Sequence, residues 1–327
     1  MKAFSNVNAR DMKDAASQLQ AASKKGQSAV IVGGGSDALG MVKERLITPD
    51  VLVSLKSIRG LDRVTEKGGE VVIGGLITLD ALSRDPLIRK NYNVLAEAAG
   101  HVGTPQIRNA GTLAGNVCQR PWCWYYRNGF PCFKNGGNTC FSITGENEFH
   151  AIFGGGPSFI VHPSDTAVAL VALDAKFRIV GASGERTISA ADFFKLPAEN
   201  PARENVLGSD EVLAEIHLPA AKAGTRSTYH KEMDREAWTH AVVSVAVVME
   251  MDGQVCRAAR VVLGGVAPIP WRVPKVEAML AGKRITPELA AQAGAAAVEG
   301  ARPLAKNQYK VPLTQAVVKQ TIVTLGA

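Results

Sequence analysis

The sequence predicts a mixed α+β protein built in two parts, and three observations support this prediction. Its 327 residues are enough for about two domains at the usual length of roughly 100–200 residues each. Near the N-terminus, a helical pattern, a short apolar strand, a glycine run and a second strand follow one another. In the last third, two long apolar strands flank a turn, and helical stretches follow them.

The first part opens with a small unit of alternating elements. Apolar residues spaced three to four apart predict an amphipathic helix over residues 8–25, which ends at Gly26. Short apolar runs predict strands over 28–32 and 51–55, and a glycine run follows the first of them directly. A hairpin is expected over 61–75.

The rest of the chain alternates helices with strands. Thr78 and Pro86 are typical residues for the starts of two helices that extend to Ala99. The segment 104–116 is rich in glycine, asparagine and threonine, so we expect it to be mostly loop, and a helix is predicted over 165–174. Strands are predicted over 176–180, 186–188, 211–218, 228–231, 241–251 and 256–263. Helices are predicted near 274–280, 287–298 and 313–325.

Composition excludes several classes of protein. Hydrophobic residues make up 46% and charged residues 20%, which is typical of a globular protein and too apolar for a disordered one. No apolar run approaches the roughly 20 residues of a membrane helix, and the N-terminus lacks the apolar segment of a secretory signal. We therefore expect no membrane span, and a cytoplasmic location, or a periplasmic one if a partner carries the export signal. The formal charge of +7 comes without any nucleic-acid-binding motif, which favours partner docking over nucleic acid.

Two glycine-rich segments are candidate phosphate sites. Residues 33–37 read Gly-Gly-Gly-Ser-Asp, and residues 111–116 read Gly-Thr-Leu-Ala-Gly-Asn. Such loops let backbone N–H groups face an anion without obstruction by Cβ atoms, and two of them can face the two phosphates of one dinucleotide. Neither segment matches the Rossmann fingerprint or the P-loop. The alternative for the first loop is a tight turn from a strand into a helix.

Four of the five cysteines lie within 23 residues of one another. Their spacing is C-x4-C-x8-C-x7-C, and they are Cys118, Cys123, Cys132 and Cys140. An iron–sulfur cluster is the favoured interpretation, because a cubane takes four thiolates and its ligands can come from an irregular loop. Structural zinc, which usually uses paired short knuckles, is the second interpretation, and disulfides would need an oxidising compartment. Cys256 lies on a predicted strand and is expected to be a core thiol.

The charges around these cysteines are one-sided. No Asp or Glu occurs between residues 113 and 145, whereas Arg120, Arg127 and Lys134 are present. Basic neighbours favour the reduced, more negative state of an anionic cluster. The alternative is a basic loop that faces solvent or a partner.

Several motifs together resemble a known family. Val-Gly-Gly-Gly-Ser-Asp at 32–37, Gln-Ile-Arg-Asn-Ala-Gly-Thr-Leu-Ala-Gly-Asn at 106–116 and His-Pro-Ser-Asp at 162–165 occur in this order. Tyr-His-Lys at 229–231 and Leu-Gly-Gly-Val-Ala-Pro at 263–268 follow. Over essentially its whole length, the chain resembles the FAD-binding medium subunits of the molybdenum hydroxylases, a family that includes xanthine dehydrogenase, carbon monoxide dehydrogenase and bacterial aldehyde oxidoreductases.

The resemblance implies a fold and a division into domains. It implies an FAD-binding domain of the vanillyl-alcohol-oxidase (PCMH) type over residues 1–222, with subdomains of about 1–57 and 58–222. Residues 117–157 would be a cysteine-rich insertion in this domain. A smaller α+β domain of the molybdenum hydroxylase flavoprotein type would follow over 223–327.

The resemblance also implies which residues bind the cofactors. The first pyrophosphate loop would consist of Val32, Gly33, Gly34, Gly35, Ser36 and Asp37. The second would consist of Thr112, Ala114, Gly115 and Asn116, with Ala114 at a position where many relatives carry glycine. Further contacts to FAD would come from Asp165, Leu213 and Lys231, although Asp165 could instead be a helix N-terminal residue and Lys231 a solvated one.

The cysteine-rich insertion is similar to that of subunits with an extra [4Fe–4S] cluster, which resemble 4-hydroxybenzoyl-CoA reductase and the periplasmic aldehyde oxidoreductase. Cys-Trp-Tyr-Tyr-Arg at 123–127 and Phe-Pro-Cys at 130–132 look closest to the aldehyde oxidoreductase type. The four clustered cysteines would be the cluster ligands. Some relatives have a cysteine shortly before the His-Pro-Ser-Asp stretch, where this chain has Ser158, and here Cys118 lies upstream instead.

The implied function is electron transfer. A large subunit would oxidise an aldehyde at its molybdenum cofactor, [2Fe–2S] clusters of a small subunit would pass the electrons on, and FAD in this chain would deliver them to an external acceptor. We expect no catalytic acid or base in this chain, since the flavin carries the chemistry. Two alternatives are a zinc-stabilised assembly or binding module without redox activity, and a stand-alone flavin oxidase.

Overall fold

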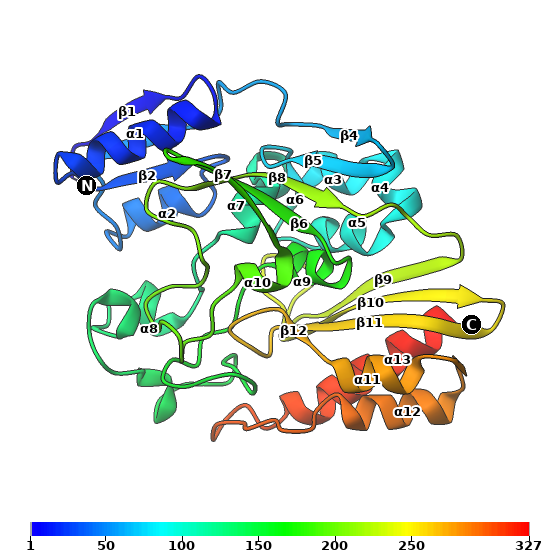
Figure 1. Cartoon of the computed structure of the whole chain (residues 1–327). Helices are drawn as coiled ribbons and strands as arrows, with labels where there is room; N and C mark the ends of the chain where they lie inside the picture. Colours follow the sequence, from blue (N-terminus) through cyan, green and yellow to red (C-terminus); the bar gives the residue numbers. More distant parts are fainter. Residues whose placement is uncertain (1, 327) are drawn as a thin grey trace.

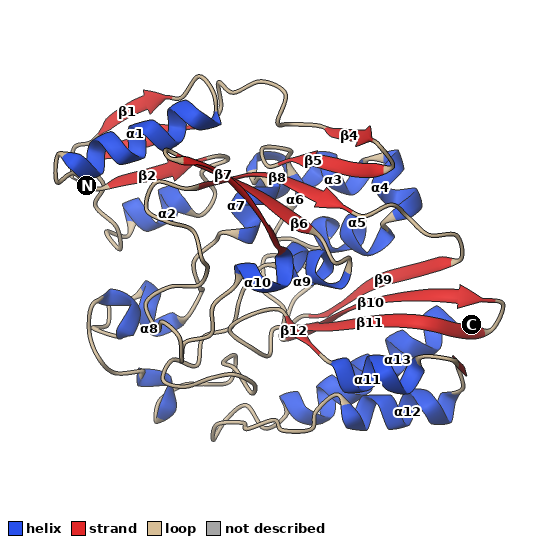
Figure 2. Ribbon diagram, in the orientation of Figure 1, coloured by secondary structure: helices blue, strands red, loops and turns tan. Residues whose placement is uncertain are grey.

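The computed structural model describes residues 2–326, in which three β-sheets each pack against their own helices. Figure 1 shows an N-terminal sheet at the top, a central sheet beside it, and a C-terminal sheet with helices beneath. Residues 117–157, which we call the insertion, lie at the lower left (Figure 1) and consist mainly of loops (Figure 2). The insertion therefore projects between the first and last units of the chain.

The N-terminal unit is a parallel sheet of order β1-β3-β2 covered by helix α1. The buried face of α1 packs Met12 and Leu19 into one core with Val53 of the central strand. Asp11 caps the helix by accepting a hydrogen bond from the N–H of Asp14. The elements are β1 (Ser5–Asn8), α1 (Met12–Lys24), β2 (Ala29–Val32), α2 (Ala38–Lys43) and β3 (Val51–Ser54).

The central unit is an antiparallel sheet of order β4-β5-β8-β6-β7. Its inner face and the surrounding helices bury one large core, to which Ile73, Leu95 and Phe177 contribute. The strands are β4 (Val64–Lys67), β5 (Glu70–Gly74), β6 (Lys176–Gly181), β7 (Gly184–Ser189) and β8 (Val212–Leu218). The helices are α3 (Leu79–Arg84), α4 (Pro86–Asn91), α5 (Asn93–Gly100), α9 (Asp165–Ala172) and α10 (Ala190–Phe193).

The C-terminal sheet is covered by helices on both faces, which explains its long apolar strands. Val245 and Val247 of β10 face the core of the C-terminal helices, whereas Ala246 and Val248 face the central core. Alternate side chains of a strand point to opposite faces, so a strand buried on both faces reads as a continuous apolar run. The strands are β9 (Thr225–Glu232), β10 (Val243–Asp252), β11 (Val255–Gly264), β12 (Trp271–Arg272) and β13 (Lys283–Arg284). The helices are α11 (Pro274–Leu280), α12 (Pro287–Ala296) and α13 (Lys310–Gly326).

The expectation that residues 104–116 are mostly loop is wrong. They form α6 (Pro105–Ala110) and most of α7 (Leu113–Val117). Thr104 caps α6 with Pro105 in its first turn, and Thr112 caps α7 by accepting from the N–H of Gly115 at 3.2 Å. Both are standard helix starts. The high content of glycine and asparagine in this segment made them hard to recognise in the sequence.

The insertion has only short turns of helix, as its lack of periodicity predicts. These are α8 (Trp124–Arg127), η1 (Phe133–Asn135) and η2 (Phe141–Ile143). Strand β1 and helices α2 and α10 were not predicted, because each is only four to six residues long. The predicted domain boundary at residue 222 falls between β8 and β9 and stays a prediction. Across residues 2–326, no helix has the length and apolarity needed to cross a membrane.

Candidate dinucleotide site and cysteine cavity

The two predicted glycine loops touch each other, although almost eighty residues separate them in the sequence. A Cβ atom on Gly34 would lie 1.8 Å from the carbonyl oxygen of Ala110, and one on Gly33 would lie 2.8 Å from Thr112 Oγ1. Gly35 has a φ of +79°, which favours glycine. The first loop therefore needs glycines because the second loop occupies the space of their side chains.

Two residues of the insertion hold the end of the first loop. Asp37 accepts a hydrogen bond from the backbone N–H of Arg120 at 3.1 Å and another from Arg127 Nη2 at 2.8 Å. The Arg127 side chain is only 8% exposed, and its guanidinium carbon lies 4.2 Å from the ring centre of Trp122. Arg127 thus connects the insertion directly to the first glycine loop.

The second loop is fixed from behind by buried hydrogen bonds. Asn116 Oδ1 accepts from Ser164 Oγ at 2.7 Å and from Thr166 Oγ1 at 2.6 Å. The N–H of Ala114 donates to the carbonyl oxygen of Gly75 at 3.0 Å. These contacts tie the loop to α9 and to the central sheet.

Two cavities meet where the loops touch. The first, of about 350 Å³, is called the indole cavity because Trp122, Trp238 and His240 line it. The second, of about 330 Å³, is called the strand cavity because Val30, Ile31 and other strand residues line it. Residues that line both cavities are Ser36, Asp37, Thr112, Gly115 and Gln119. Together the cavities form an elongated site whose middle is the glycine loops.

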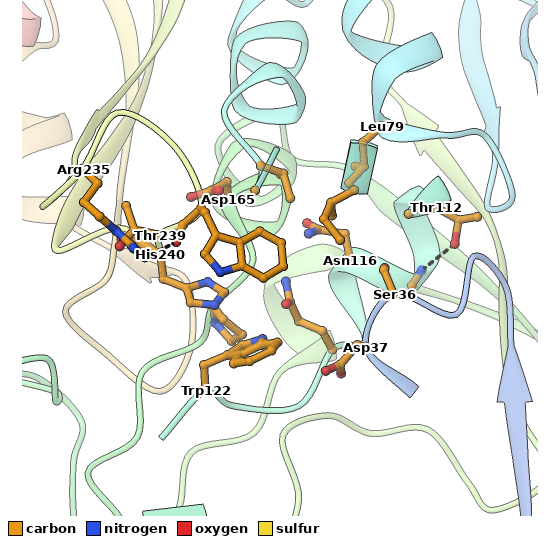
Figure 3. Close-up of a pocket in the computed structure, with 18 residues that line it drawn as sticks. Ser36, Asp37, Leu79, Thr112, Asn116, Trp122, Asp165, Arg235, Thr239 and His240 are labelled. Atoms are coloured by element: carbon orange, nitrogen blue, oxygen red, sulfur yellow. Dashed lines mark hydrogen bonds between the residues drawn. The ribbon is translucent and has the colours of Figure 1, made fainter. Parts of the chain in front are cut away.

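Figure 3 shows how the indole cavity is built from distant parts of the chain. Trp122 and His240 lie on one side, and Ser36 and Asn116 lie on the other. The rings of Trp122 and His240 are 5.4 Å apart. Flat apolar rings on one wall and polar loop groups on the other suit a ligand with an aromatic part and an anionic part.

Asp165 lines the indole cavity and is held by a buried network. It is the first residue of α9, and its carboxylate accepts from Tyr229 Oη at 2.6 Å and from Lys231 Nζ at 2.8 Å. Lys231 is fully buried and also donates to the carbonyl oxygen of His101 at 3.0 Å. Burial and the neighbouring Asp165 raise the pKa of Tyr229 well above its usual value. Lys231 is therefore not a solvated residue, and it supports Asp165 from outside the cavity lining.

The remaining predicted FAD residues lie around the strand cavity. Leu213 of β8, Ala114 and the three glycines of the first loop line it. Val32 ends β2 with its side chain buried, and its carbonyl oxygen accepts from the N–H of Leu55. Val32 positions the loop through its backbone and does not line either cavity.

Three of the four clustered cysteines line the same cavity, and the fourth does not. Cys123, Cys132 and Cys140 line one small cavity in the insertion, the cysteine cavity. Cys118 lines the strand cavity instead, where burial raises its pKa to about 12. Cys256 is buried on β11, as expected for a core thiol. No three His, Cys, Asp or Glu side chains within residues 2–326 are close enough together to hold a single metal ion.

The three basic residues of the insertion are each paired with a carboxylate. Arg120 Nε lies 2.9 Å and Lys134 Nζ lies 2.6 Å from the carboxylate of Glu204, and Arg127 pairs with Asp37. The stretch from 113 to 145 contains no acidic residue, but the fold brings two carboxylates, those of Glu204 and Asp37, to its basic side chains. Lys134 nevertheless lines the cysteine cavity, where burial lowers its pKa.

Sequence reasoning missed the indole cavity. Arg235, Trp238 and His240 come from the connection between β9 and β10, which carries no motif. The available signal in the sequence was a tryptophan within a polar segment. In the structure this residue, Trp238, is 57% exposed. Trp122 belongs to the insertion, and its position in the sequence does not indicate that it lies in the same cavity as the glycine loops.

The residues present fit a flavin dinucleotide. The two loops meet at the centre of an elongated site with an aromatic wall at one end and an apolar pocket at the other. Comparison with protein families agrees with this geometry. The family described as the FAD binding domain in molybdopterin dehydrogenase matches residues 2–221. The family described as the CO dehydrogenase flavoprotein C-terminal domain matches residues 228–325.

Individual relatives extend over nearly the whole chain. The aldehyde oxidoreductase FAD-binding subunit PaoB of Escherichia coli (strain K12) is 33% identical over 326 residues, which cover 96% of both chains. The carbon monoxide dehydrogenase medium chain of Hydrogenophaga pseudoflava is 29% identical over 302 residues, covering 91% of this chain and 89% of that one. A solved structure of carbon monoxide dehydrogenase from Hydrogenophaga pseudoflava superposes with a TM-score of 0.77 at 27% identity, covering 98% and 96% of the two chains.

Fold and site together define an FAD-binding oxidoreductase subunit. More particularly, the chain belongs to the FAD-binding medium subunits of the molybdenum hydroxylases. The predicted fold class and family are confirmed.

Proposed function

We propose that this chain is the FAD-binding electron-transfer subunit of a heterotrimeric molybdenum hydroxylase, and that the complex oxidises aldehydes. The observation that carries the proposal is the pair of touching glycine loops at the junction of two cavities. The 33% identity to the aldehyde oxidoreductase subunit over nearly the whole chain supports the aldehyde substrate. The partners are a large molybdenum-cofactor subunit and a small [2Fe–2S] subunit.

The residues of the site suggest how the cofactor is held. The loops at 33–37 and 111–116 would hold the pyrophosphate, because both line the junction of the cavities. The indole cavity would hold the flavin ring, since indole and imidazole rings stack on flat aromatic ligands. The strand cavity, with Leu213, would hold the adenosine. Asp165 would contact the flavin half, and Lys231, which donates to its carboxylate at 2.8 Å, would hold that carboxylate in place.

The chemistry of this chain would consist of binding and orientation. When bound, the flavin supplies the exchange of electrons between the [2Fe–2S] clusters of the small subunit and an external acceptor. The buried network behind Asp165 would orient its carboxylate, and the packing of Arg127 against Trp122 would orient the indole wall. The insertion would hold an additional [4Fe–4S] cluster, for which the converging thiols of the cysteine cavity are the support.

Purification of the full-length tagged chain from its native host tests this function. We expect large and small subunits to co-purify, with about one FAD per chain and aldehyde-dependent reduction of the flavin absorbance. A preparation without flavin would contradict the proposal. Zinc in place of iron and flavin would indicate the assembly module, and turnover of small alcohols by the isolated chain would indicate a stand-alone oxidase.

A further inference from the structure

A third cavity adjoins the indole cavity and is not assigned to FAD in the proposed function. Its volume is about 470 Å³, against about 350 Å³ for the indole cavity and 330 Å³ for the strand cavity. We call it the acidic cavity because Glu146, Glu148 and Asp234 line it. Trp122 and His240, seen together in Figure 3, line both this cavity and the indole cavity. A cavity of this size suits a small organic ligand.

Aromatic side chains line the acidic cavity and remain open to solvent. Trp124 is 65% exposed, Phe149 is 53% exposed and Trp122 is 44% exposed, although each carries a large apolar ring. Exposed apolar side chains that gather in one place mark binding sites. The faces of such rings stack on flat aromatic molecules and attract cations. The rings therefore favour a flat aromatic ligand, and they favour one with a positive charge.

The charges around the acidic cavity favour the same sign of ligand. Three carboxylates line it, and within residues 2–326 no Lys or Arg does. Lys306 lies 2.6 Å from Glu146 and 3.9 Å from Glu148, so one positive charge faces two carboxylates. Asp234, on the connection between β9 and β10, has no ion-pair partner in the described part of the chain. The remaining negative charge attracts a cation and repels an anion.

His150 lines the acidic cavity and has one ring nitrogen without a partner. The residue is 7% exposed, and its Nε2 lies 3.4 Å from Cys123 Sγ, whereas its Nδ1 has no hydrogen-bond partner within residues 2–326. A buried polar atom without a partner costs free energy, which a ligand that bonds to it recovers. Burial lowers the pKa of His150 to about 4 and also lowers the pKa of His240. Both rings are therefore neutral at pH 7 and add no positive charge to the cavity.

The wall that carries Glu148 and Phe149 is held in place by the start of α13. Tyr309 Oη donates to the carbonyl oxygen of Glu148 at 3.0 Å, and Lys310 Nζ donates to the carbonyl oxygen of Phe149 at 3.0 Å. Lys310 is fully buried. These bonds fix the backbone of the wall before any ligand arrives, which lowers the entropic cost of binding.

We propose that the acidic cavity binds a flat aromatic cation. The ring of the cation packs against Trp124 and Phe149, and its positive charge lies toward Glu148 and Asp234. This ligand is separate from FAD, and its binding does not depend on the proposed function. An aromatic anion is excluded by the carboxylates, and a neutral aromatic molecule gains only the stacking.

Isothermal titration calorimetry of the full-length chain, saturated with FAD, tests this inference. The probe is proflavine, a flat tricyclic cation, and the control is resorufin, a flat tricyclic anion of similar size. We expect about one proflavine to bind per chain, with a dissociation constant about tenfold or more below that of resorufin. Absence of proflavine binding, or equal affinity for the two dyes, would overturn the inference. The titration needs no bound flavin, so a chain that binds proflavine but never FAD would contradict the proposed function alone.

The same titration on the co-purified complex distinguishes a small ligand from a partner protein. We expect the complex to bind proflavine as the isolated chain does. Binding by the chain but not by the complex would mean that a side chain of a partner subunit fills the cavity, and this outcome would also overturn the inference.

Substitutions locate the bound probe. Asp234→Asn and Glu148→Gln each remove one charge at nearly constant size and should raise the dissociation constant of proflavine about two- to fivefold. Trp124→Ala should raise it by a similar factor of about two to five, because it removes a ring face. Asp62→Asn is the matched control, since it removes an exposed carboxylate that lines none of the three cavities, and it should change nothing. An equal loss in Asp62→Asn, or unchanged binding in the other three variants, would contradict the assignment, and unchanged FAD content confirms that each variant is folded.

Discussion

The dinucleotide site and the cysteine cavity are neighbours, but the sequence encodes them differently. Each glycine loop is a contiguous motif, and the fold brings two such motifs into contact at Gly34 and Ala110. The cysteine cavity is assembled from single residues of separate turns, with Ser158 from outside the insertion. Contiguous motifs reveal a site by their local backbone chemistry, whereas scattered ligands become visible only when the fold is known.

The largest effect is expected behind the dinucleotide site. Lys231→Met leaves the carboxylate of Asp165 buried without its charged partner, and breaking such a pair costs about 3–5 kcal/mol of the free energy of unfolding. Urea denaturation and flavin content measure it. The control is Lys275→Met, which removes an exposed pair with Glu299 and should cost at most about 1 kcal/mol. Equal losses in both variants would mean that the buried network does not support the site.

A side chain between the two loops should separate them. Gly34→Ala places a Cβ against the carbonyl oxygen of Ala110, and overpacking of this kind costs about 1–3 kcal/mol. We expect the dissociation constant of FAD to rise about tenfold or more, measured by flavin fluorescence titration. Gly40→Ala is the matched control, because a Cβ there meets no atom within 4 Å and alanine favours helix α2. Tight FAD binding by Gly34→Ala would show that the loops can separate without loss.

The link between the two regions is tested at Arg127. Arg127→Gln removes the charge-assisted hydrogen bond to Asp37, worth about 1.5–3 kcal/mol for a hydrogen bond to a charged group. FAD binding should weaken about tenfold while the iron content stays unchanged. Arg10→Gln, which loses an exposed pair with Asp14, should change neither quantity. An equal loss of iron and FAD would contradict the separation of the two sites.

The last prediction concerns a pH dependence in the segment that joins the regions, and it is given as a slope of stability against pH. Burial lowers the pKa of His162 to about 3, from 6.5 in its ordinary state. The folded state therefore binds fewer protons than the unfolded state, and the stabilisation present above pH 6.5 is lost as the pH falls toward 3. His162→Asn, whose amide oxygen can still accept from the N–H of Ser164, should reduce the slope of stability against pH by up to about 1.4 kcal/mol per unit. Urea denaturation at several pH values between 4 and 7 checks this, and an unchanged slope would contradict it.

Much of the fold was predictable because its signals are local. The period of apolar residues located α1, the Asp252-Gly253 turn located the hairpin of β10 and β11, and proline marked the starts of α11 and α12. The helices α6 and α7 were missed because glycine and asparagine outweighed their threonine caps. In that segment the composition predicted a loop and the capping residues predicted helices, and the structure has the helices.

Less of the site was predictable, because its parts meet through tertiary contacts. Trp238 and His240 carry no motif, and their place in the indole cavity depends on how the sheet of β9 and β10 packs on the central unit. The pairing of Arg127 with Asp37 joins residues 90 positions apart. The insertion has an excess of basic residues in its own sequence. In the folded protein, carboxylates from other parts of the chain pair with those residues.

By itself, the sequence determined the family, the fold class and the two glycine loops, since backbone freedom and hydrophobic period are written in neighbouring residues. The tertiary structure alone decided that the loops touch, that Lys231 is buried against Asp165, and that Cys118 and Ser158 line different cavities. The physical reason is that a side chain's burial and partners depend on packing between elements that are far apart in the chain. The sequence shows how many cysteines the insertion contains and how they are spaced. Which of them line the same cavity depends on how the insertion packs.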